Sequence, residues 1–245
     1  MESLPKKGKA TRMLAGFLGM LVFYVGVQWA INRTAAPEWV PLDDPAGYRM
    51  LTTGAVSRGA FDPLVGLSTR EARPVGDDRL CEALFFDGTG PGVPVAYFTD
   101  FFCPNCRKTE AMLAEAAQIG AITLSRHDWP ILGQASEQAA RAHLAAGLQN
   151  GEVAFRTRLL RAAFVPDETY LRDLSVSAGL DADRLLADMT SPEVEDHLDR
   201  AQNVADRFGF YATPSTVIGK TVIIGALDAK TFAAILTAEA QASCR

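Results

Sequence analysis

The hydrophobic pattern of this chain begins with an uncharged apolar run at 13–31, rich in Leu, Val, Phe, Gly and Met. Four basic residues precede it: Lys6, Lys7, Lys9 and Arg12. The run is close to the ~20 residues that cross the apolar core of a bilayer. Basic residues on its N-terminal side favour a cytoplasmic start and export of the remainder. The pattern therefore predicts a cytoplasmic basic segment at 1–12 and a transmembrane anchor at 13–31.

A cleaved signal peptide is the alternative interpretation of this run. Its apolar region is normally shorter, ~7–15 residues, and ends at a small-x-small cleavage site. Thr34-Ala35-Ala36 fits such a site poorly, so we favour an uncleaved anchor. Both interpretations place the rest of the chain outside the cytoplasm.

The segment 32–79 contains scattered Pro, Gly and Asp and sustains neither a helical nor a strand period. This composition is typical of a linker or an extended stretch that wraps over a domain. From Leu80 the apolar runs are shorter and more regular, and we expect the folded domain at 80–245. A short strand is expected at 84–86, followed by a buried strand at 93–99.

A helix is predicted from Pro104 to about residue 118, because proline at the first helical position loses no hydrogen bond. Loose alternation at 121–127 predicts a second strand. A helical stretch follows at about 134–208, with starts marked by Ser136, Asp167, Asp181 and Ser191. β-branched runs at 215–218 and 221–224 predict a hairpin, and a final helix begins at Asp228. This order predicts an α/β fold with one central sheet and a helical insertion.

Composition narrows the possible partners. The chain has 245 residues, of which 48% are hydrophobic and 22% charged, enough for one domain with a sizeable core. A net charge of −5 argues against a nucleic-acid partner, which would require a basic face. With only three histidines, a His-rich metal site is disfavoured, and we expect no metal and no cofactor.

Cys103 and Cys106 lie at the start of the predicted helix. On the first helical turn, this spacing brings two sulfur atoms within bonding range. The helix N-terminus carries partial positive charge and free N–H groups, which stabilise a thiolate on Cys103. Cys106, one turn further in, is expected to be more buried and to act as the resolving thiol. The pair therefore predicts thiol–disulfide exchange.

Zinc binding and a static disulfide are the alternatives for this pair. A structural zinc site normally uses four ligands, often from two such pairs, and the sequence contains no second one. Cys81 and Cys244 are predicted to form a structural disulfide between the start of the domain and its tail. An intermolecular bridge or a second, regulatory redox pair remains open for them.

Three segments resemble the DsbA-like thioredoxin-fold family, in the family's order. The segment 95–106 (VAYFTDFFCPNC) resembles the family's active-site strand and helix. The segments 129–136 and 139–142 resemble the start of its helical insertion. The segment 211–218 (YATPSTVI) resembles its cis-proline loop and the strand that follows. The resemblance covers about residues 80–242. It implies a thioredoxin fold with a helical insertion at about 130–208.

The resemblance also implies roles for residues of the site. Cys103 would be the surface-exposed nucleophile and Cys106 the resolving cysteine. Pro214 would be cis and face the disulfide, and Thr213 would present its backbone to an extended substrate peptide. Pro104 and Asn105, between the cysteines, would tune the thiolate.

Two positions depart from the family's pattern. Many thioredoxin-fold enzymes carry a buried acid six residues before the first cysteine, and Tyr97 stands there in this chain. Asp100 is nearer to the pair, but the alternation of side chains along a strand allows its carboxylate to point away from the cysteines. Asn105 replaces the histidine of the most oxidising members, so we expect a less extreme depression of the Cys103 pKa.

The function implied is dithiol–disulfide exchange with cysteine-containing exported proteins, on the periplasmic side of the inner membrane. A membrane quinone-linked oxidase resembling DsbB would restore the disulfide. One alternative is a reductase or isomerase kept reduced by a DsbD-like membrane donor. Another is a copper- or haem-pathway thiol protein that uses Cys103 and Cys106 as ligands.

Five other residues were weighed for roles around the site. His127 is a candidate for the border of the active-site groove, although a boundary residue is the more common interpretation. His143 and His197 are expected on helix surfaces. Phe101 and Phe102 flank the motif and could provide an apolar substrate platform, with core packing as the default for the inward-facing one.

Overall fold

The computed structural model describes residues 19–20, 24, 39–52, 73, 75–86, 90–161 and 166–241. The chain divides into two units, Met1–Glu38 and Trp39–Arg245. In the first unit, the described residues Gly19, Met20 and Tyr24 are helical and exposed. Among all described residues, no helix is both long and apolar enough to span a membrane. The predicted anchor at 13–31 lies almost entirely outside the described residues.

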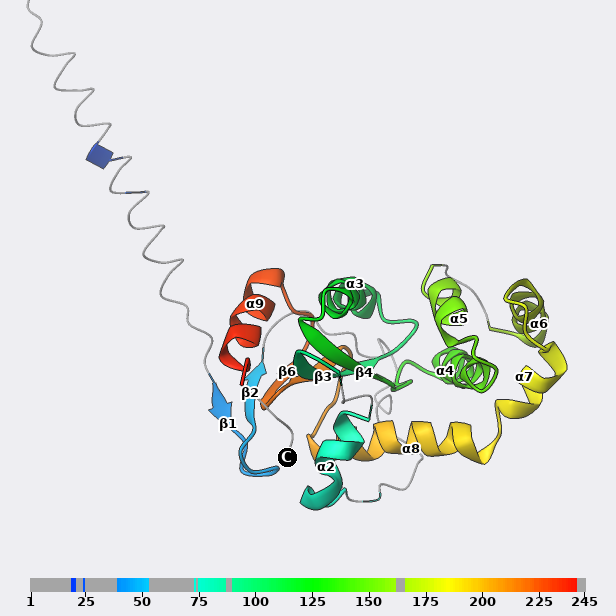
Figure 1. Ribbon diagram of the computed structural model, residues 1–245, viewed down its shortest axis with the longest axis horizontal. Helices are drawn as coiled ribbons and strands as arrows, with labels where there is room; N and C mark the ends of the chain where they lie inside the picture. Colours follow the sequence, from blue (N-terminus) through cyan, green and yellow to red (C-terminus); the bar gives the residue numbers. More distant parts are fainter. Residues whose placement is uncertain are drawn as a thin grey trace, which may run out of the picture. The chain divides into compact units, whose positions relative to one another are not determined.

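A mixed sheet forms the centre of the second unit, with strand order β1-β2-β6-β5-β3-β4 (Figure 1). Its strands are Val40–Pro41 (β1), Arg49–Thr52 (β2), Val93–Thr99 (β3), Ile122–Asp128 (β4), Ser215–Ile218 (β5) and Thr221–Ile224 (β6). β3 and β4 are parallel and are joined by α3 (Pro104–Gln118), whereas β5 and β6 form an antiparallel hairpin. The elements predicted at 93–99, 104–118 and 215–224 are therefore confirmed.

Helices cover both faces of the sheet. α3 and α9 (Ala229–Ala238) lie over one face, and α2 (Asp77–Leu84) and α8 (Pro192–Arg207) over the other (Figure 1). Side chains along β3 point alternately to the two faces of the sheet, and each face has its own hydrophobic cluster. Val95 and Tyr97 belong to the cluster between the sheet and α3 and α9, and Phe98 belongs to the cluster between the sheet and α2 and α8. Burial on both faces explains the continuous apolar run of this strand.

In the residues that the structure describes, the predicted helical stretch contains five helices. They are α4 (Gln134–Gly147), α5 (Glu152–Leu159), α6 (Glu168–Ser177), α7 (Ala182–Asp188) and α8. The side chains of Asp167, Asp181 and Ser191 cap α6, α7 and α8, as predicted. α4 begins at Gln134 instead of Ser136, because the Ser136 hydroxyl donates to Asp100 and does not cap the helix.

α8 connects the insertion to the sheet. Its first half, with Val194 and Leu198, packs in the cluster formed by α4–α7. Its second half, with Ala201 and Val204, packs against the sheet. The insertion is therefore held to the thioredoxin core by one continuous helix as well as by its loops.

Two predictions before residue 90 are wrong. Within the predicted linker at 32–79, β1 and β2 belong to the sheet, and β2 pairs in parallel with β6. The predicted strand at 84–86 is absent: Leu84 ends α2, whose Leu80 and Leu84 face the core one helical turn apart. The folded unit thus begins well before residue 80.

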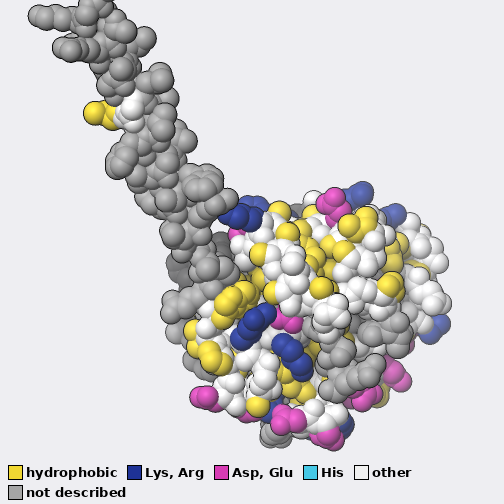
Figure 2. Space-filling model, turned by 60° about the vertical axis from the view of Figure 1, so that its left-hand side comes forward, with side chains coloured by type: hydrophobic (Ala, Val, Ile, Leu, Met, Phe, Trp, Pro, Cys, Tyr) yellow, Lys and Arg dark blue, Asp and Glu magenta, His cyan; other side chains and the backbone are white. Residues whose placement is uncertain are grey.

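The surface of the second unit carries charges of both signs. On the face in Figure 2, Lys and Arg side chains are interspersed with Asp and Glu, and hydrophobic side chains lie between them. This mixed pattern agrees with the modest net charge of −5.

Candidate active site

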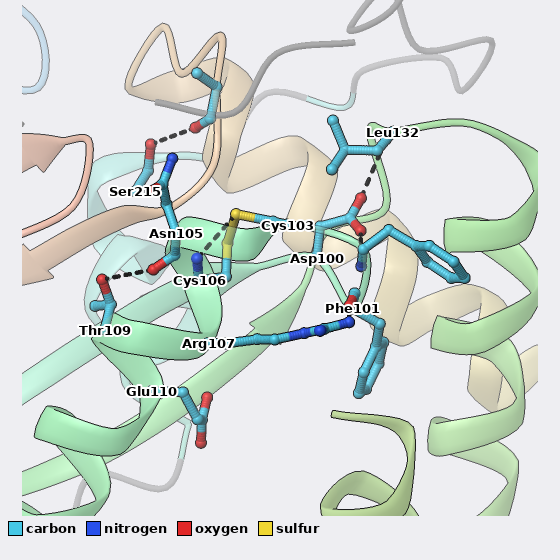
Figure 3. Close-up of a disulfide and its surroundings, with 12 residues drawn as sticks. Asp100, Phe101, Cys103, Asn105, Cys106, Arg107, Thr109, Glu110, Leu132 and Ser215 are labelled. Carbon is cyan, nitrogen blue, oxygen red and sulfur yellow. Dashed lines mark hydrogen bonds between the residues drawn. A yellow bond between two sulfur atoms is a disulfide. The ribbon is translucent and has the colours of Figure 1, made fainter. Parts of the chain in front are cut away.

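The cysteine pair lies at the N-terminus of α3 (Figure 3). Cys103 is the N-cap in extended conformation, and Pro104 occupies the first helical turn. The two cysteines form a disulfide with a Cα–Cα distance of 5.2 Å. The backbone N–H of Cys106 donates to Cys103 Sγ at 3.0 Å. The sulfur of Cys103 is thus a side-chain cap, so a thiolate at the same place would receive a charge-assisted hydrogen bond.

The two cysteines do not differ in exposure. Both side chains are 0% exposed and belong to the apolar cluster under α3 and α9. The expected surface exposure of Cys103 is therefore absent in this disulfide state. Pro104 is exposed and Asn105 half-buried, so the motif meets solvent through the residues between the cysteines.

The Thr213–Pro214 peptide bond is cis. β3 and β5 are antiparallel and pair Phe98 with Ser215, so this peptide lies just beyond the end of β3, where the chain continues to Cys103. Gly225 N–H donates to the Pro214 carbonyl at 2.8 Å, which fixes the loop to the end of β6. The Thr213 side chain is buried, and its hydroxyl has no hydrogen-bond partner among the described residues.

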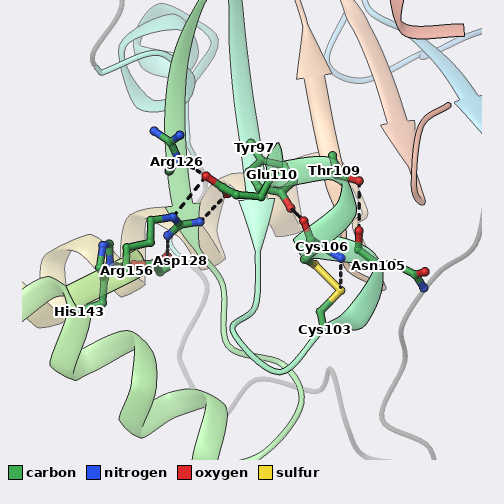
Figure 4. Close-up of polar contacts among 10 residues, drawn as sticks. All are labelled: Tyr97, Cys103, Asn105, Cys106, Thr109, Glu110, Arg126, Asp128, His143 and Arg156. Atoms are coloured by element: carbon green, nitrogen blue, oxygen red, sulfur yellow. Dashed lines mark hydrogen bonds and ion pairs between the residues drawn. A yellow bond between two sulfur atoms is a disulfide. The ribbon is translucent and has the colours of Figure 1, made fainter. Parts of the chain in front are cut away.

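Tyr97 lies in β3 beneath the first turn of α3. Its hydroxyl donates to the Cys106 carbonyl at 2.7 Å (Figure 4). Burial raises the pKa of Tyr97 well above its usual value, so the phenol remains neutral. The position that carries an acid in many thioredoxin-fold enzymes therefore holds a neutral hydrogen-bond donor to the active-site helix.

Asp100 points away from the cysteines toward the start of the insertion. One oxygen accepts from Phe102 N–H and the Ser136 hydroxyl, each at 2.8 Å, and the other from the amides of Ile131 and Leu132 (Figure 3). Burial raises the pKa of Asp100 to about 6, although these hydrogen bonds oppose the shift. Asp100 thus ties the loop before Cys103 to the loop before α4.

A buried charge network joins α3 to the insertion (Figure 4). Arg156 on α5 binds Glu110 on α3 at 2.7 Å and Asp128 on β4 at 3.1 Å. Asp128 also contacts His143 Nδ1 on α4 at 2.5 Å, and Arg126 binds Glu110 from β4 at 2.8 Å. The expectation that His143 lies on a helix surface is therefore wrong.

The two carboxylates of this network stay ionised. Burial acts to raise the pKa of Glu110, but Arg156 and Arg126 outweigh it and hold that pKa below its usual value. The pKa of Asp128 falls to about 2, because His143 and Arg156 likewise outweigh its burial. No sequence pattern predicts this network, since its members come from four elements with no common spacing.

His127 is a core residue, not a residue of the groove. Its ring stacks on Phe98 with 4.3 Å between centroids, and Nε2 lies 2.9 Å from the Leu84 carbonyl at the end of α2. Burial lowers its pKa to about 4, so the imidazole is neutral at pH 7. Neither the groove role nor the boundary-residue interpretation is correct, because His127 is buried in the core with its ring nitrogen hydrogen-bonded to a carbonyl.

Phe101 and Phe102 have different surroundings. Phe101 is buried, with the Arg156 guanidinium 5.3 Å from its ring centroid and the His143 ring 5.3 Å away. Phe102 is half-buried. Phe101 is therefore the inward-facing member of the pair. Cys81 lies in α2, whereas Cys244 lies outside the described residues, so their predicted disulfide stays a prediction.

The fold, the disulfide at the start of α3 and the cis-proline loop together define a dithiol enzyme of the thioredoxin class. The model of the DSBA-like thioredoxin domain family matches residues 94–237, and the chain belongs to this family. It is a DsbA-like thiol–disulfide oxidoreductase, and Cys103 and Cys106 form its Cys-x-x-Cys pair.

Solved structures agree with this assignment. A thioredoxin-like oxidoreductase from Silicibacter pomeroyi DSS-3 is 31% identical, with a TM-score of 0.58 over 66% of this chain and 98% of that one. The thiol-disulfide exchange protein alpha-DsbA2 from Wolbachia pipientis is 22% identical, with a TM-score of 0.56 over 66% and 96%. The catalytic domain of Proteus mirabilis ScsC is 22% identical, with a TM-score of 0.56 over 68% and 99%. No curated protein matches the chain.

Proposed function

We propose that this oxidoreductase introduces disulfides into exported proteins. The observation that supports this direction is the hydrogen bond from Cys106 N–H to Cys103 Sγ at the N-terminus of α3. The same donor and the helix dipole favour a thiolate on Cys103, and hence the reduced enzyme. A dithiol whose reduced form is stabilised gives up its disulfide readily and acts as an oxidant.

The reaction proceeds through a mixed disulfide. A substrate thiolate attacks Cys103 Sγ, the S–S bond breaks, and its electron pair passes to the Cys106 sulfur, which takes up a proton. A second substrate thiolate then attacks the substrate sulfur of the mixed disulfide and displaces Cys103 as a thiolate. The substrate loses two electrons and the enzyme gains them. A membrane oxidase resembling DsbB would remove them again.

Substrate approach involves the loop at Thr213–Pro214. An extended peptide would lie along this loop and present its cysteine to Cys103. Because both sulfur atoms are buried in the disulfide state, the surroundings of the pair must open locally before attack. A Cys106→Ser variant cannot form the internal disulfide, so it should not oxidise a reduced substrate. Its Cys103 thiolate should instead attack a substrate disulfide, release one substrate thiolate and remain in a mixed disulfide, because Cys106 is not there to resolve it.

The proposed location is the inner membrane, with the catalytic domain on the periplasmic side. The basic flank and the uncharged run at 13–31 support it. Alkaline extraction of membranes should leave the protein in the pellet, and the intact mass of the isolated chain should include residues 1–31. Release into the soluble fraction with a shortened mass would instead establish a cleaved signal peptide.

A glutathione redox titration of the full-length protein tests the direction. A potential near DsbA's, about −120 mV, would support an oxidase, and one near thioredoxin's, about −270 mV, would support a reductase kept reduced by a membrane donor. Refolding of a reduced, cysteine-containing substrate should require Cys103, so Cys103→Ser should abolish it. Full turnover in that variant would overturn the mechanism.

Stoichiometric copper binding without exchange activity would favour the metal-binding alternative.

A further inference from the structure

Arg107 follows Cys106 on α3 and turns back toward the loop that leads to Cys103 (Figure 3). Its Nη2 donates to the Phe101 carbonyl at 3.4 Å. The side chain is half-buried, and its Nε is buried without a hydrogen-bond partner among the described residues. The guanidinium is therefore packed beside the active-site loop instead of extending into solvent.

The charge of Arg107 has no carboxylate partner within the described ranges. Two other arginines beside α3 are matched: Arg126 and Arg156 both bind Glu110, and Arg156 also binds Asp128. Among the residues that the structure describes, Arg107 makes one hydrogen bond, the long one to the neutral Phe101 carbonyl. A half-buried cation is screened less by solvent and salt than an exposed one, so its field reaches neighbouring groups.

In the described part of the chain, the other charged and titratable groups near the pair are engaged elsewhere or exposed. From β3, Tyr97 bonds the Cys106 carbonyl, and the Asp100 carboxylate accepts four donors on the side of the insertion. From α3, Glu110 is matched by two arginines. Lys108 is exposed.

We propose that Arg107 is a positioning residue that stabilises the Cys103 thiolate. Its hydrogen bond to the Phe101 carbonyl ties the first turn of α3 to the loop that keeps Cys103 at the N-cap, so its charge lies beside the segment that carries the thiolate. Arg107 thereby supplies the positive charge that the neutral Asn105 does not. The inference rests on the proposed function only in taking Cys103 as the sulfur that exchanges with the substrate.

The test measures the ionisation of Cys103 in the reduced full-length protein. The rate of alkylation by iodoacetamide is followed against pH, and mass spectrometry of peptides identifies the modified cysteine. Arg107→Gln removes the half-buried charge, Lys108→Gln removes an exposed charge from the next residue, and Arg107→Lys keeps the charge. Thermal unfolding of each oxidised variant verifies that it is folded.

Arg107→Gln should lower the alkylation rate of Cys103 at pH values below its pKa by about three- to tenfold, the effect of one nearby charge at protein-surface dielectric constants. Lys108→Gln should leave the rate unchanged, and Arg107→Lys should restore most of it. The disulfide of Arg107→Gln should also be harder to reduce with glutathione, by a similar factor.

Three results would each overturn the proposal: no change in Arg107→Gln, equal changes in Arg107→Gln and Lys108→Gln, or a loss in Arg107→Lys as large as in Arg107→Gln. The last would show that the guanidinium acts through packing and not through charge. The proposed function fails separately, if the wild-type protein does not oxidise substrates, and that result leaves the measured Cys103 ionisation intact.

Discussion

Tyr97 places a neutral hydrogen-bond donor directly beneath the disulfide. Its hydroxyl bonds the Cys106 carbonyl at 2.7 Å, and burial keeps it protonated. A buried carboxylate at this position would repel a thiolate on either cysteine. The sequence shows that a tyrosine stands at this position, but it does not predict the hydrogen bond to the Cys106 carbonyl, because that bond depends on how α3 crosses β3.

We predict that Tyr97→Phe lowers the free energy of unfolding by about 1 kcal/mol, the net value of one buried hydrogen bond. The ring volume is kept, so packing should change little. Urea unfolding of the oxidised protein measures the loss. The pH profile of Cys103 alkylation should match that of the wild type, and a displaced profile would show that the phenol takes part in proton transfer.

His127 makes the stability of the protein depend on pH. Its pKa falls from 6.5 to about 4 on folding, chiefly through burial. A base with a depressed folded pKa is protonated first in the unfolded chain. Its contribution to stability is therefore complete above pH 6.5 and is lost as the pH falls toward 4.

We predict that protonation of His127 removes about 3 kcal/mol of unfolding free energy across this interval. His127→Gln is the matched control, since its amide can still donate to the Leu84 carbonyl but does not titrate. Unfolding free energies of both proteins, measured from pH 7 to 4, should diverge below about pH 6.5. Parallel curves would mean that the imidazole is not responsible.

At the scale of elements, α3 is held to the insertion by the buried charges of Glu110, Arg156 and Asp128. Both carboxylates bind the same guanidinium, whose side chain is 9% exposed. Removing one member leaves an uncompensated buried charge, and such losses are large even where the intact pair adds little. The network therefore fixes how the active-site helix sits against α4 and α5.

We predict that Glu110→Gln lowers the free energy of unfolding by about 3 kcal/mol or more. A double-mutant cycle with Arg156→Gln should give a coupling energy above about 1 kcal/mol. Glu168→Gln, which breaks the exposed pair with Arg172 on α6, is the control and should leave stability unchanged. Additive losses for Glu110 and Arg156 would show that the two residues act independently.

The elements predicted most accurately carry local signals. Pro104 predicted the start of α3, and the capping side chains of Asp167, Asp181 and Ser191 predicted the starts of α6–α8. The β-branched runs at 215–218 and 221–224 predicted the hairpin. A strand was wrongly predicted at 84–86, at the end of α2, because the apolar triplet outweighed the helical spacing of Leu80 and Leu84. Periodicity cannot distinguish a short buried strand from the end of a helix.

At the scale of the whole molecule, β2 is an element that local sequence patterns do not predict, because it is defined by a long-range strand pairing. It is four residues long, and its partner β6 lies far along the sequence. Arg49 at its start binds Glu239 beyond α9 at 2.8 Å and donates to Thr221 of β6 at 3.0 Å. A pairing of this kind leaves no periodicity in a short strand, so the segment resembled a linker. The buried charges around α3 likewise leave no local pattern in the sequence, because Glu110, Arg156 and Asp128 come together only when the insertion packs against α3.

The position of β2 predicts where the domain can be shortened. A chain beginning at Trp39 keeps both N-terminal strands and should unfold cooperatively with full exchange activity. A chain beginning at Val75 removes β1 and β2, which exposes the edge of β6 and leaves Glu239, buried at 5% exposure, without Arg49. We expect it to unfold at a lower denaturant concentration or to aggregate through the free edge, because an exposed strand edge is a template for pairing. Denaturant unfolding and light scattering of the two proteins measure this. Equal midpoints would mean that β1 and β2 only wrap over a sheet that is complete without them.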